Sequence, residues 1–307
     1  MRRLLIVLVV ALLAGLLVAC GGGDEAPLPS VTGKIGEKPT VTAPDGEPSA
    51  SLVSRVIRQG DGALIANGDL VVVDYLGQLW RDDKEFDTSY DKAPVGFRLG
   101  KDPIIAGWVD GLKGKTVGSR VLLVVPPDKA FGAQGAPDAG IRGDDTLVFV
   151  IDVLGSFTGT SSLSGTAKAI HDDGLPSVTG AADKKPAVKI PARATPPSKT
   201  TARTVIAGDG NQITKGDLVV AKYVGLSWST GKQFDSSWDR GEAVSFNLEE
   251  SQVIKGWVVG LAGVTAGSRV LLVIPPGSGY GEDRRPEAGI KQNETLVFAV
   301  DVLATFS

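Results

Sequence analysis

The sequence of 307 residues contains one cysteine, Cys20, and one histidine, His171. A single cysteine excludes any disulfide within the chain, so the folded part must be stabilised by its core alone. His171 falls in a stretch rich in Gly, Ser and Thr, which excludes a Ser-His-Asp triad, a Cys-His pair and a histidine-rich metal site. We therefore expect no metal and no cofactor.

An excess of positive charge is also lacking, since the net charge is -3, and we expect no nucleic-acid partner. The 40 glycines and 18 prolines favour many turns and short strands over long helices. A hydrophobic content of 42% is enough for folded cores, which excludes a wholly disordered chain.

The sequence is repeated over a long period. Ile104–Trp108 returns as Val253–Trp257, and Val117–Pro127 returns as Ala266–Pro276, each about 148 residues later. This period is much longer than that of a solenoid repeat and matches the size of a whole domain. The chain therefore contains two copies of one domain in tandem.

The N-terminus has the pattern of an export signal. Arg2 and Arg3 precede 16 apolar residues, Leu4–Ala19, a run that is short for a membrane span and typical of a signal peptide. The end of this run, Leu17–Cys20, resembles the lipobox of bacterial lipoproteins, which implies that residues 1–20 are removed and that Cys20 carries a lipid. The alternative is an ordinary secretory signal with an incidental cysteine.

Residues 21–50 have the composition of a tether, and residues 158–200 that of a linker. However, the segment Leu28–Gly33 recurs as Leu175–Gly180, and a featureless linker would have no reason to repeat the same sequence. We expect a short extension that packs against each domain as an edge strand. The domains themselves are placed at 51–157 and 201–307.

Within each copy, short apolar runs bounded by turn residues predict strands. The runs lie at 69–77, 120–125 and 147–154, and again at 217–225, 269–274 and 296–303. Short helices are expected only around Trp108 and Trp257. The fold class is therefore α+β, with mostly antiparallel sheet.

The motifs of the second copy, taken jointly, resemble the FKBP-type peptidyl-prolyl cis-trans isomerases. They are Tyr223–Gly225, Phe234–Arg240, Val253–Trp257, Gly279–Gly281 and Thr295–Phe298, in this order. The resemblance covers about 100 residues of each copy. It implies an antiparallel sheet wrapped around one short helix, with an apolar pocket between them and a tryptophan as its floor.

The resemblance also implies the roles of residues in the second pocket. Its walls and floor would be Tyr223, Phe234, Val253, Ile254, Trp257, Tyr280, Ile290 and Phe298. The Ile254 N–H and the Tyr280 hydroxyl would bind substrate carbonyls, and a buried Asp235 would lie near Tyr223 and Arg240. Val244 departs from the phenylalanine common in the family, which thins one wall.

The first copy keeps the same frame but differs at two positions. The frame consists of Tyr75, Phe86, Asp87, Ile104, Ile105, Trp108, Ile141 and Phe149. Val95 is at the position equivalent to Val244, so both copies have a valine where the family commonly has phenylalanine. Phe131 replaces the pocket tyrosine and Lys92 replaces the arginine. A hydroxyl hydrogen bond contributes about 0.5–1.5 kcal/mol, so the first domain should be weakened by up to roughly tenfold.

Rotation about an X–Pro bond is opposed by amide resonance of about 18–20 kcal/mol. A dry aromatic pocket favours the less polar twisted amide, so no nucleophile or proton acceptor is needed. The sequence thus predicts an isomerase on the outer face of the bacterial plasma membrane, anchored through Cys20. Its expected partners are X-Pro segments of exported proteins and macrolides of the rapamycin type.

Two other functions remain open from the sequence. Both pockets could bind proline segments without turnover, as a holdase or binding module. A structural envelope lipoprotein with vestigial domains would predict erosion of both pockets, and the second is intact. The charged loop at 282–285 of the second copy would be a solvated rim, or it would contribute to substrate selection. The matching loop of the first copy, residues 133–136, is uncharged, so in the second case the two domains would prefer different substrates.

Overall fold

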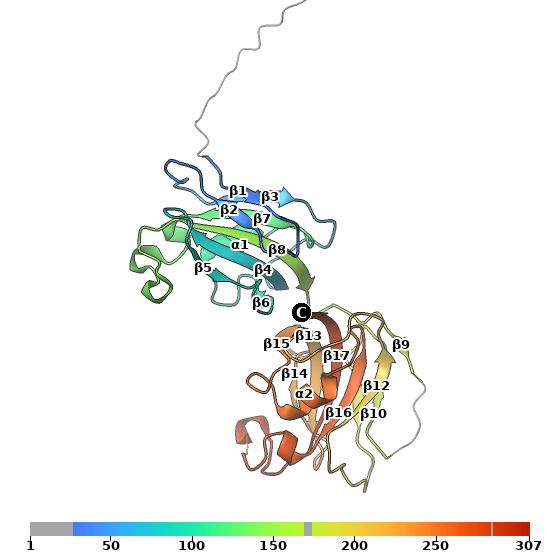
Figure 1. The fold of residues 1–307 in the computed structure, drawn as a ribbon. Helices are drawn as coiled ribbons and strands as arrows, with labels where there is room; N and C mark the ends of the chain where they lie inside the picture. Colours follow the sequence, from blue (N-terminus) through green and yellow to red (C-terminus); the bar gives the residue numbers. More distant parts are fainter. Residues whose placement is uncertain (1–26, 169–173, 284) are drawn as a thin grey trace, which may run out of the picture.

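The computed structural model describes residues 27–168, 174–283 and 285–307. The predicted signal, Cys20 and His171 lie outside the described residues. The rest forms two tandem α+β domains, each an antiparallel sheet with one short helix on its face (Figure 1). The predicted fold class is confirmed. Within the described ranges, no helix is long and apolar enough to cross a membrane.

The first domain is built on a sheet of six strands in the order β3-β7-β8-β4-β5, with β6 also paired to β4. Its elements are β3 (Val53–Arg58), β4 (Leu70–Leu79), β5 (Glu85–Thr88), β6 (Val95–Arg98), α1 (Ala106–Leu112), β7 (Arg120–Val125), β8 (Leu147–Phe157) and the 3₁₀ turns η1 (Pro127–Lys129), η2 (Gly132–Gln134) and η3 (Pro137–Ala139). The ten-residue β4 and eleven-residue β8 form its centre.

The second domain repeats this order as β12-β16-β17-β13-β14, with β15 paired to β13. Its elements are β12 (Thr201–Ala207), β13 (Leu218–Ser227), β14 (Gln233–Ser236), β15 (Val244–Asn247), α2 (Lys255–Leu261), β16 (Arg269–Ile274), η4 (Pro276–Ser278), η5 (Pro286–Ala288) and β17 (Leu296–Phe306). A seventh strand, β9 (Thr166–Ala167), comes from the segment between the domains and pairs with β12.

Each helix lies close against the sheet because glycines face it. A Cβ at Gly107 would lie 2.4 Å from Val125, and one at Gly256 would lie 2.3 Å from Ile274. A larger residue at either position would push the helix away from the sheet. The close approach of helix and sheet also fixes the distance between the sheet and the tryptophan that follows each glycine, and this tryptophan is buried in the inner core.

The outer face of each sheet is covered by a small hairpin. The hairpins are β1 (Ser30–Thr32) with β2 (Thr40–Thr42), and β10 (Ser177–Thr179) with β11 (Ala187–Lys189). Val41 packs on the outer side chains of β7 and β8, and Val178 packs on those of β16 and β17. The repeated segments that begin at Leu28 and Leu175 therefore form separate two-stranded hairpins, and not the edge strands of the main sheets that the sequence led us to expect.

A buried ion pair joins each hairpin to its sheet. Arg120 is 2% exposed and binds Asp152 at 2.6 Å, while its remaining N–H groups donate to the carbonyls of Gly33, Lys34 and Glu37 in the hairpin turn. Such a pair is stable only when all its donors are satisfied, and here the hairpin carbonyls satisfy them. In the second domain Arg269 binds Asp301 at 2.6 Å and donates to carbonyls of its own hairpin.

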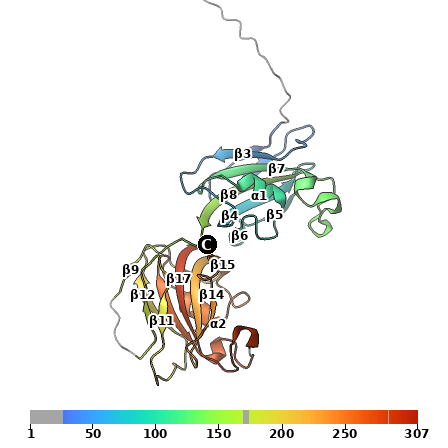
Figure 2. The same cartoon turned by 180° about the vertical axis from the view of Figure 1, so that it is seen from behind.

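The two domains meet where β4 and β13 begin and where β8 and β17 end, near the C-terminus (Figure 2). Leu70 and Val72 of the first domain and Leu218 and Val220 of the second are buried in one apolar cluster there. The rings of Phe157 and Phe306 pack edge to face, with centroids 6.3 Å apart. The domains therefore share a small core of their own.

Candidate functional site

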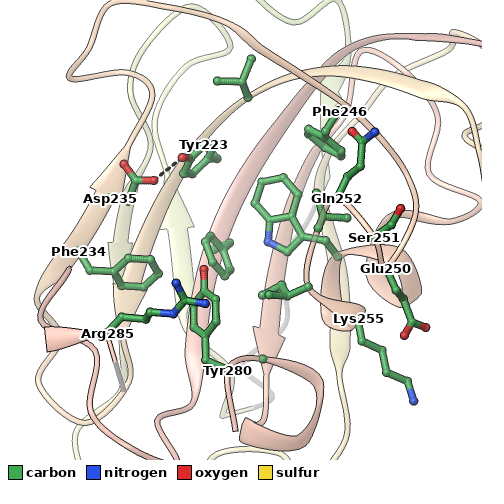
Figure 3. Close-up of a pocket in the computed structure, with 16 residues that line it drawn as sticks. Tyr223, Phe234, Asp235, Phe246, Glu250, Ser251, Gln252, Lys255, Tyr280 and Arg285 are labelled. Atoms are coloured by element: carbon green, nitrogen blue, oxygen red, sulfur yellow. Dashed lines mark hydrogen bonds between the residues drawn. The ribbon is translucent and has the colours of Figure 1, made fainter. Parts of the chain in front are cut away.

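The second domain contains a cavity of about 590 Å³ between α2, the sheet and the loop that carries Tyr280 (Figure 3). Pockets that bind small ligands or short peptide segments have volumes of this order. The lining residues are Tyr223, Phe234, Asp235, Val244, Phe246, Glu250, Ser251, Gln252, Val253, Ile254, Lys255, Trp257, Gly279, Tyr280, Arg285 and Phe298.

Aromatic rings form the floor and walls of this cavity. The indole of Trp257 is 6% exposed, and the rings of Tyr223, Phe246 and Phe298 surround it with centroids 5.1 to 5.4 Å away and steep interplanar angles. Phe234 packs on Phe298 in the same edge-to-face manner, at 5.5 Å. Edge-to-face pairs of this geometry each contribute about 0.5–1.5 kcal/mol beyond the burial of the rings, so the floor of the cavity is also a stabilising part of the domain.

One side of the cavity has a polar rim. The Tyr223 hydroxyl donates to Asp235, and the Arg240 guanidinium bonds Asp235 and lies 3.1 Å from the Tyr223 oxygen. Arg240 also binds Glu242 at 2.7 Å. Asp235 is half-exposed, which corrects the expectation of a buried carboxylate: β14 is at the edge of the sheet and leaves one side of Asp235 open to solvent.

This network keeps its protonation states fixed at neutral pH. Burial, reinforced by the hydrogen bond to Asp235, raises the pKa of Tyr223 to about 12. Burial alone would raise the pKa of Asp235, but the hydrogen bonds from Tyr223 and Arg240 outweigh it and lower that pKa. The rim therefore presents a neutral phenol, a carboxylate and a guanidinium at neutral pH.

The opposite side of the cavity carries the two groups expected to bind carbonyls. Ile254 is the last extended residue before α2, and its N–H has no acceptor among the described residues. The phenol of Tyr280 points into the cavity, with the guanidinium of Arg285 5.0 Å from its ring (Figure 3). The roles of both groups toward a substrate stay predictions.

Most of the predicted residues of the second pocket lie together, with two exceptions. Ile290 is 3% exposed in the core and does not line the cavity. Arg240 stands behind the lining and acts on it through Asp235 and Tyr223. Residues that line the cavity and were not predicted are Phe246, Glu250, Ser251, Gln252 and Lys255. Among them Phe246 had a signal, because the repeat places Phe97 at the equivalent position. Arg285 also lines the cavity, and it belongs to the loop at 282–285 that was expected to be a solvated rim or to select substrates.

The first domain has the same aromatic frame. Trp108 is 7% exposed, and the rings of Tyr75, Phe97 and Phe149 lie 5.1 to 5.4 Å from it. Phe86 packs on Phe149 at 5.7 Å. Ile104 and Ile105 pack on this cluster at the start of α1, and Ile141, 3% exposed, is buried within it.

The rim of the first domain is looser. The Tyr75 hydroxyl donates to Asp87 as in the second domain, but Lys92 lies 3.4 Å from Asp87 with its side chain 69% exposed. The described contacts of Lys92 reach Asp87 and not the Tyr75 hydroxyl, whereas the planar guanidinium of Arg240 bonds both the carboxylate and the phenol. Phe131, at the position of Tyr280, is 43% exposed and supplies no hydroxyl.

This combination of fold and pocket defines an isomerase-type binding domain, and comparison with known proteins gives its family. The family model described as FKBP-type peptidyl-prolyl cis-trans isomerase matches residues 62–154 and 210–303. The two matches cover more than half of the chain. The protein therefore belongs to the FKBP-type peptidyl-prolyl cis-trans isomerases and carries two such domains in tandem, as its sequence motifs indicated.

Curated relatives agree with this assignment. An FK506-binding protein of Streptomyces anulatus is 40% identical over 119 residues, which are 38% of this chain and 96% of the relative. The isomerase FkpA of Escherichia coli K12 is 44% identical over 107 residues, 34% of this chain, and the match spans only 38% of FkpA. The crystal structure of FkpA from Escherichia coli has a TM-score of 0.32 and 41% identity, over 35% of this chain and 48% of that one.

Proposed function

We propose that this isomerase is a foldase for exported proteins and that its second domain performs most of the turnover. The enzyme class follows from the family, whereas substrate, location and division of labour are our inference. The N-terminal sequence supports the location, since Arg2–Arg3, the apolar run and the lipobox ending in Cys20 are typical of an exported lipoprotein. Replacing Cys20 with Ser should release the protein from membranes into the soluble fraction.

The second pocket can favour rotation without covalent chemistry. In this proposal a proline ring would lie over Trp257, and the aromatic side chains that line the cavity would exclude water from the amide. A twisted amide is less polar than a planar one, so this environment favours the transition state over the ground state. The Ile254 N–H and the Tyr280 hydroxyl would hold the flanking carbonyls while the bond turns.

The proposal that the second domain performs most of the turnover rests on two differences between the domains at the rim of the pocket. The second domain has the Tyr280 hydroxyl and the Arg240 network, while the first has Phe131 and a solvent-exposed Lys92. Losing one hydrogen bond of about 0.5–1.5 kcal/mol slows a reaction by roughly two- to tenfold. The first domain should therefore be slower but not inactive.

The test is X–Pro isomerisation by the chain from residue 24 onward, together with Tyr280→Phe and Phe131→Tyr. We expect Tyr280→Phe to lower kcat/KM by about two- to tenfold and Phe131→Tyr to raise it. Proline-limited refolding of an exported protein should show the same order. If the wild type binds proline peptides without accelerating their isomerisation, the binding-module function replaces the foldase.

We also propose that the second pocket binds macrolides of the rapamycin type, as its family suggests. The cavity volume and the aromatic floor suit an apolar ring system. Val244 lines the cavity where a larger side chain would add contact area, so Val244→Phe should tighten macrolide binding in a calorimetric titration. Equal or weaker binding by Val244→Phe would contradict the importance of this wall.

A further inference from the structure

An arginine of the first domain reaches the rim of the second domain's pocket. Arg98, the last residue of β6, forms an ion pair with Glu242, which lies just before β15. Arg98 also binds Asp102 of its own domain at 3.1 Å. The Glu242 side chain is 17% exposed and that of Arg98 is 36% exposed, so this contact is partly shielded from solvent.

Glu242 connects this arginine to the pocket. One of its oxygens accepts from Arg98 and the other accepts from Arg240 at 2.7 Å. Arg240 in turn bonds Asp235 and the hydroxyl of Tyr223, whose side chain lines the cavity. A continuous series of charged hydrogen bonds thus leads from the first domain to the pocket wall of the second.

The connection runs in one direction only. At the position of Glu242 the first domain has Ala93 and Pro94, so no carboxylate supports Lys92 from this side. At the position of Arg98 the second domain has Asn247, which binds Gly216 within its own domain. The described contacts therefore support the second pocket from the first domain and not the reverse.

The apolar contact between the domains holds this arginine in place. Ala243, next to Glu242, is 3% exposed and lies in the shared cluster with Leu70 and Val72. Beside it, Gly96 of β6 approaches Ser245 of β15 so closely that a Cβ on Gly96 would lie 2.5 Å from the serine hydroxyl oxygen. Arg98 is thus presented to Glu242 by packed backbone and not by a free loop.

We propose that Arg98 is a positioning residue for the second pocket, so that the first domain sets the catalytic efficiency of the second. Without Arg98, the carboxylates of Asp235 and Glu242 compete for the single guanidinium of Arg240. Arg240 then spends part of its time away from Asp235 and Tyr223, and the rim loses its fixed geometry. This inference rests on the isomerase activity proposed above.

The test compares Arg98→Met with the wild type in the chain from residue 24 onward. Methionine keeps the aliphatic volume and removes the charge. We expect kcat/KM to fall by about two- to fivefold, mainly through KM, because the rim contacts bound substrate in all states. Arg98→Lys should restore part of the loss. Asp102→Asn is the matched control, since it removes the charge of the other partner of Arg98 while keeping an acceptor oxygen, and it should leave the rate unchanged.

Two further measurements separate positioning from a general structural effect. In a chain whose second pocket is disabled by Trp257→Leu, Arg98→Met should have no additional effect; a persisting loss would place its action in the first domain and overturn the proposal. The ¹⁵N NMR signal of the Arg240 Nε–H should shift and broaden in Arg98→Met. An unchanged Arg240 signal would also overturn the positioning role of Arg98, and this measurement does not depend on isomerase activity. A wild type without isomerase activity would refute the proposed function alone.

Discussion

The two domains share an aromatic floor and differ at the rim. Trp108 and Trp257 are equally buried and each is surrounded by three rings at nearly the same distances. The rim groups Lys92 and Arg240, by contrast, have different partners and exposures of 69% and 42%. The floor is also the core of the domain, so changing it costs stability, whereas the half-exposed rim can change with little effect on folding.

On the outer side of each domain, too, the features that both repeats share are those that stabilise the fold. Both domains bury an arginine–aspartate pair under a hairpin, and both hairpins supply the carbonyls that satisfy the arginine. A pair that depends on the hairpin must keep the hairpin, so both repeats retain it. What the repeats share is therefore what holds them folded, and what differs is the part that meets a ligand.

The largest effect is expected from Arg269→Ala. The substitution leaves the Asp301 charge buried without its partner and removes the donors to the carbonyls of Gly180 and Lys184. Breaking a buried pair in this way costs about 3–5 kcal/mol in the free energy of unfolding. Scanning calorimetry should show a low-temperature transition for the second domain, and the activity left above it reports the first domain alone.

The matched control for this change is Lys185→Ala in the same domain. Lys185 pairs with Asp239 at 2.6 Å, but both side chains are well exposed. Exposed pairs contribute about 0–1 kcal/mol, so the calorimetric trace should hardly move. If Arg269→Ala costs no more than this control, the hairpin does not depend on the buried pair.

The next largest effect should come from removing the floor of each pocket in turn. Trp257→Leu should lower kcat/KM of the whole chain by about three- to tenfold, because the second domain provides most of the turnover and the first domain remains active. Trp108→Leu should lower it by less than about twofold. The assay is run well below the melting temperature of each variant, which circular dichroism determines. Equal losses from the two substitutions would refute the division of labour.

Much of this fold could be predicted because the sequence states it twice. The three central strands of each domain, the short helices and the inner aromatic frame follow from local patterns that recur at matching positions, whereas the shorter strands β3, β5 and β6 and their counterparts β12, β14 and β15 were not predicted. The runs Arg120–Val125 and Arg269–Ile274 show the limit of such patterns. They predict buried strands, but only the structure shows that one face packs on the helix side and the other under a hairpin.

The parts of the site that could not be predicted depend on contacts between distant segments. Gln252 in the turn before α2 and Lys255 at the start of α2 both line the cavity, and their residue types carry no apolar signal. The pairing of Arg98 with Glu242 joins residues 144 positions apart in different domains. Ile290 shows the opposite error, since an apolar residue at a family position is buried in the core and not in the pocket.

A smaller effect is expected from Lys92→Arg in the first domain. The planar guanidinium of arginine can bond Asp87 and the Tyr75 hydroxyl together, as Arg240 does in the second domain, whereas Lys92 contacts Asp87 alone, and kcat/KM of the first pocket should rise by about two- to threefold. The measurement is made in the Trp257→Leu chain, where only the first pocket reports. Arg240→Lys, in a Trp108→Leu chain, is the reciprocal variant and should lose more than Lys92→Arg gains. The reason is that no carboxylate equivalent to Glu242 is available to fix an arginine at position 92.

The smallest effect should be that of pH on the second pocket. The pKa of Tyr223 is raised to about 12, and the pKa of Asp235 is lowered because its hydrogen bonds outweigh burial. Both groups thus keep their charge states from about pH 5 to 9, and kcat/KM of a Trp108→Leu chain should be flat over this range. The contribution of Asp235 to stability is fully present above its unfolded pKa of about 3.9 and is lost as the pH falls through its lower folded value. A bell-shaped profile between pH 5 and 9 would reveal proton transfer by a group in the pocket, and rotation by a dry aromatic environment alone would then be insufficient.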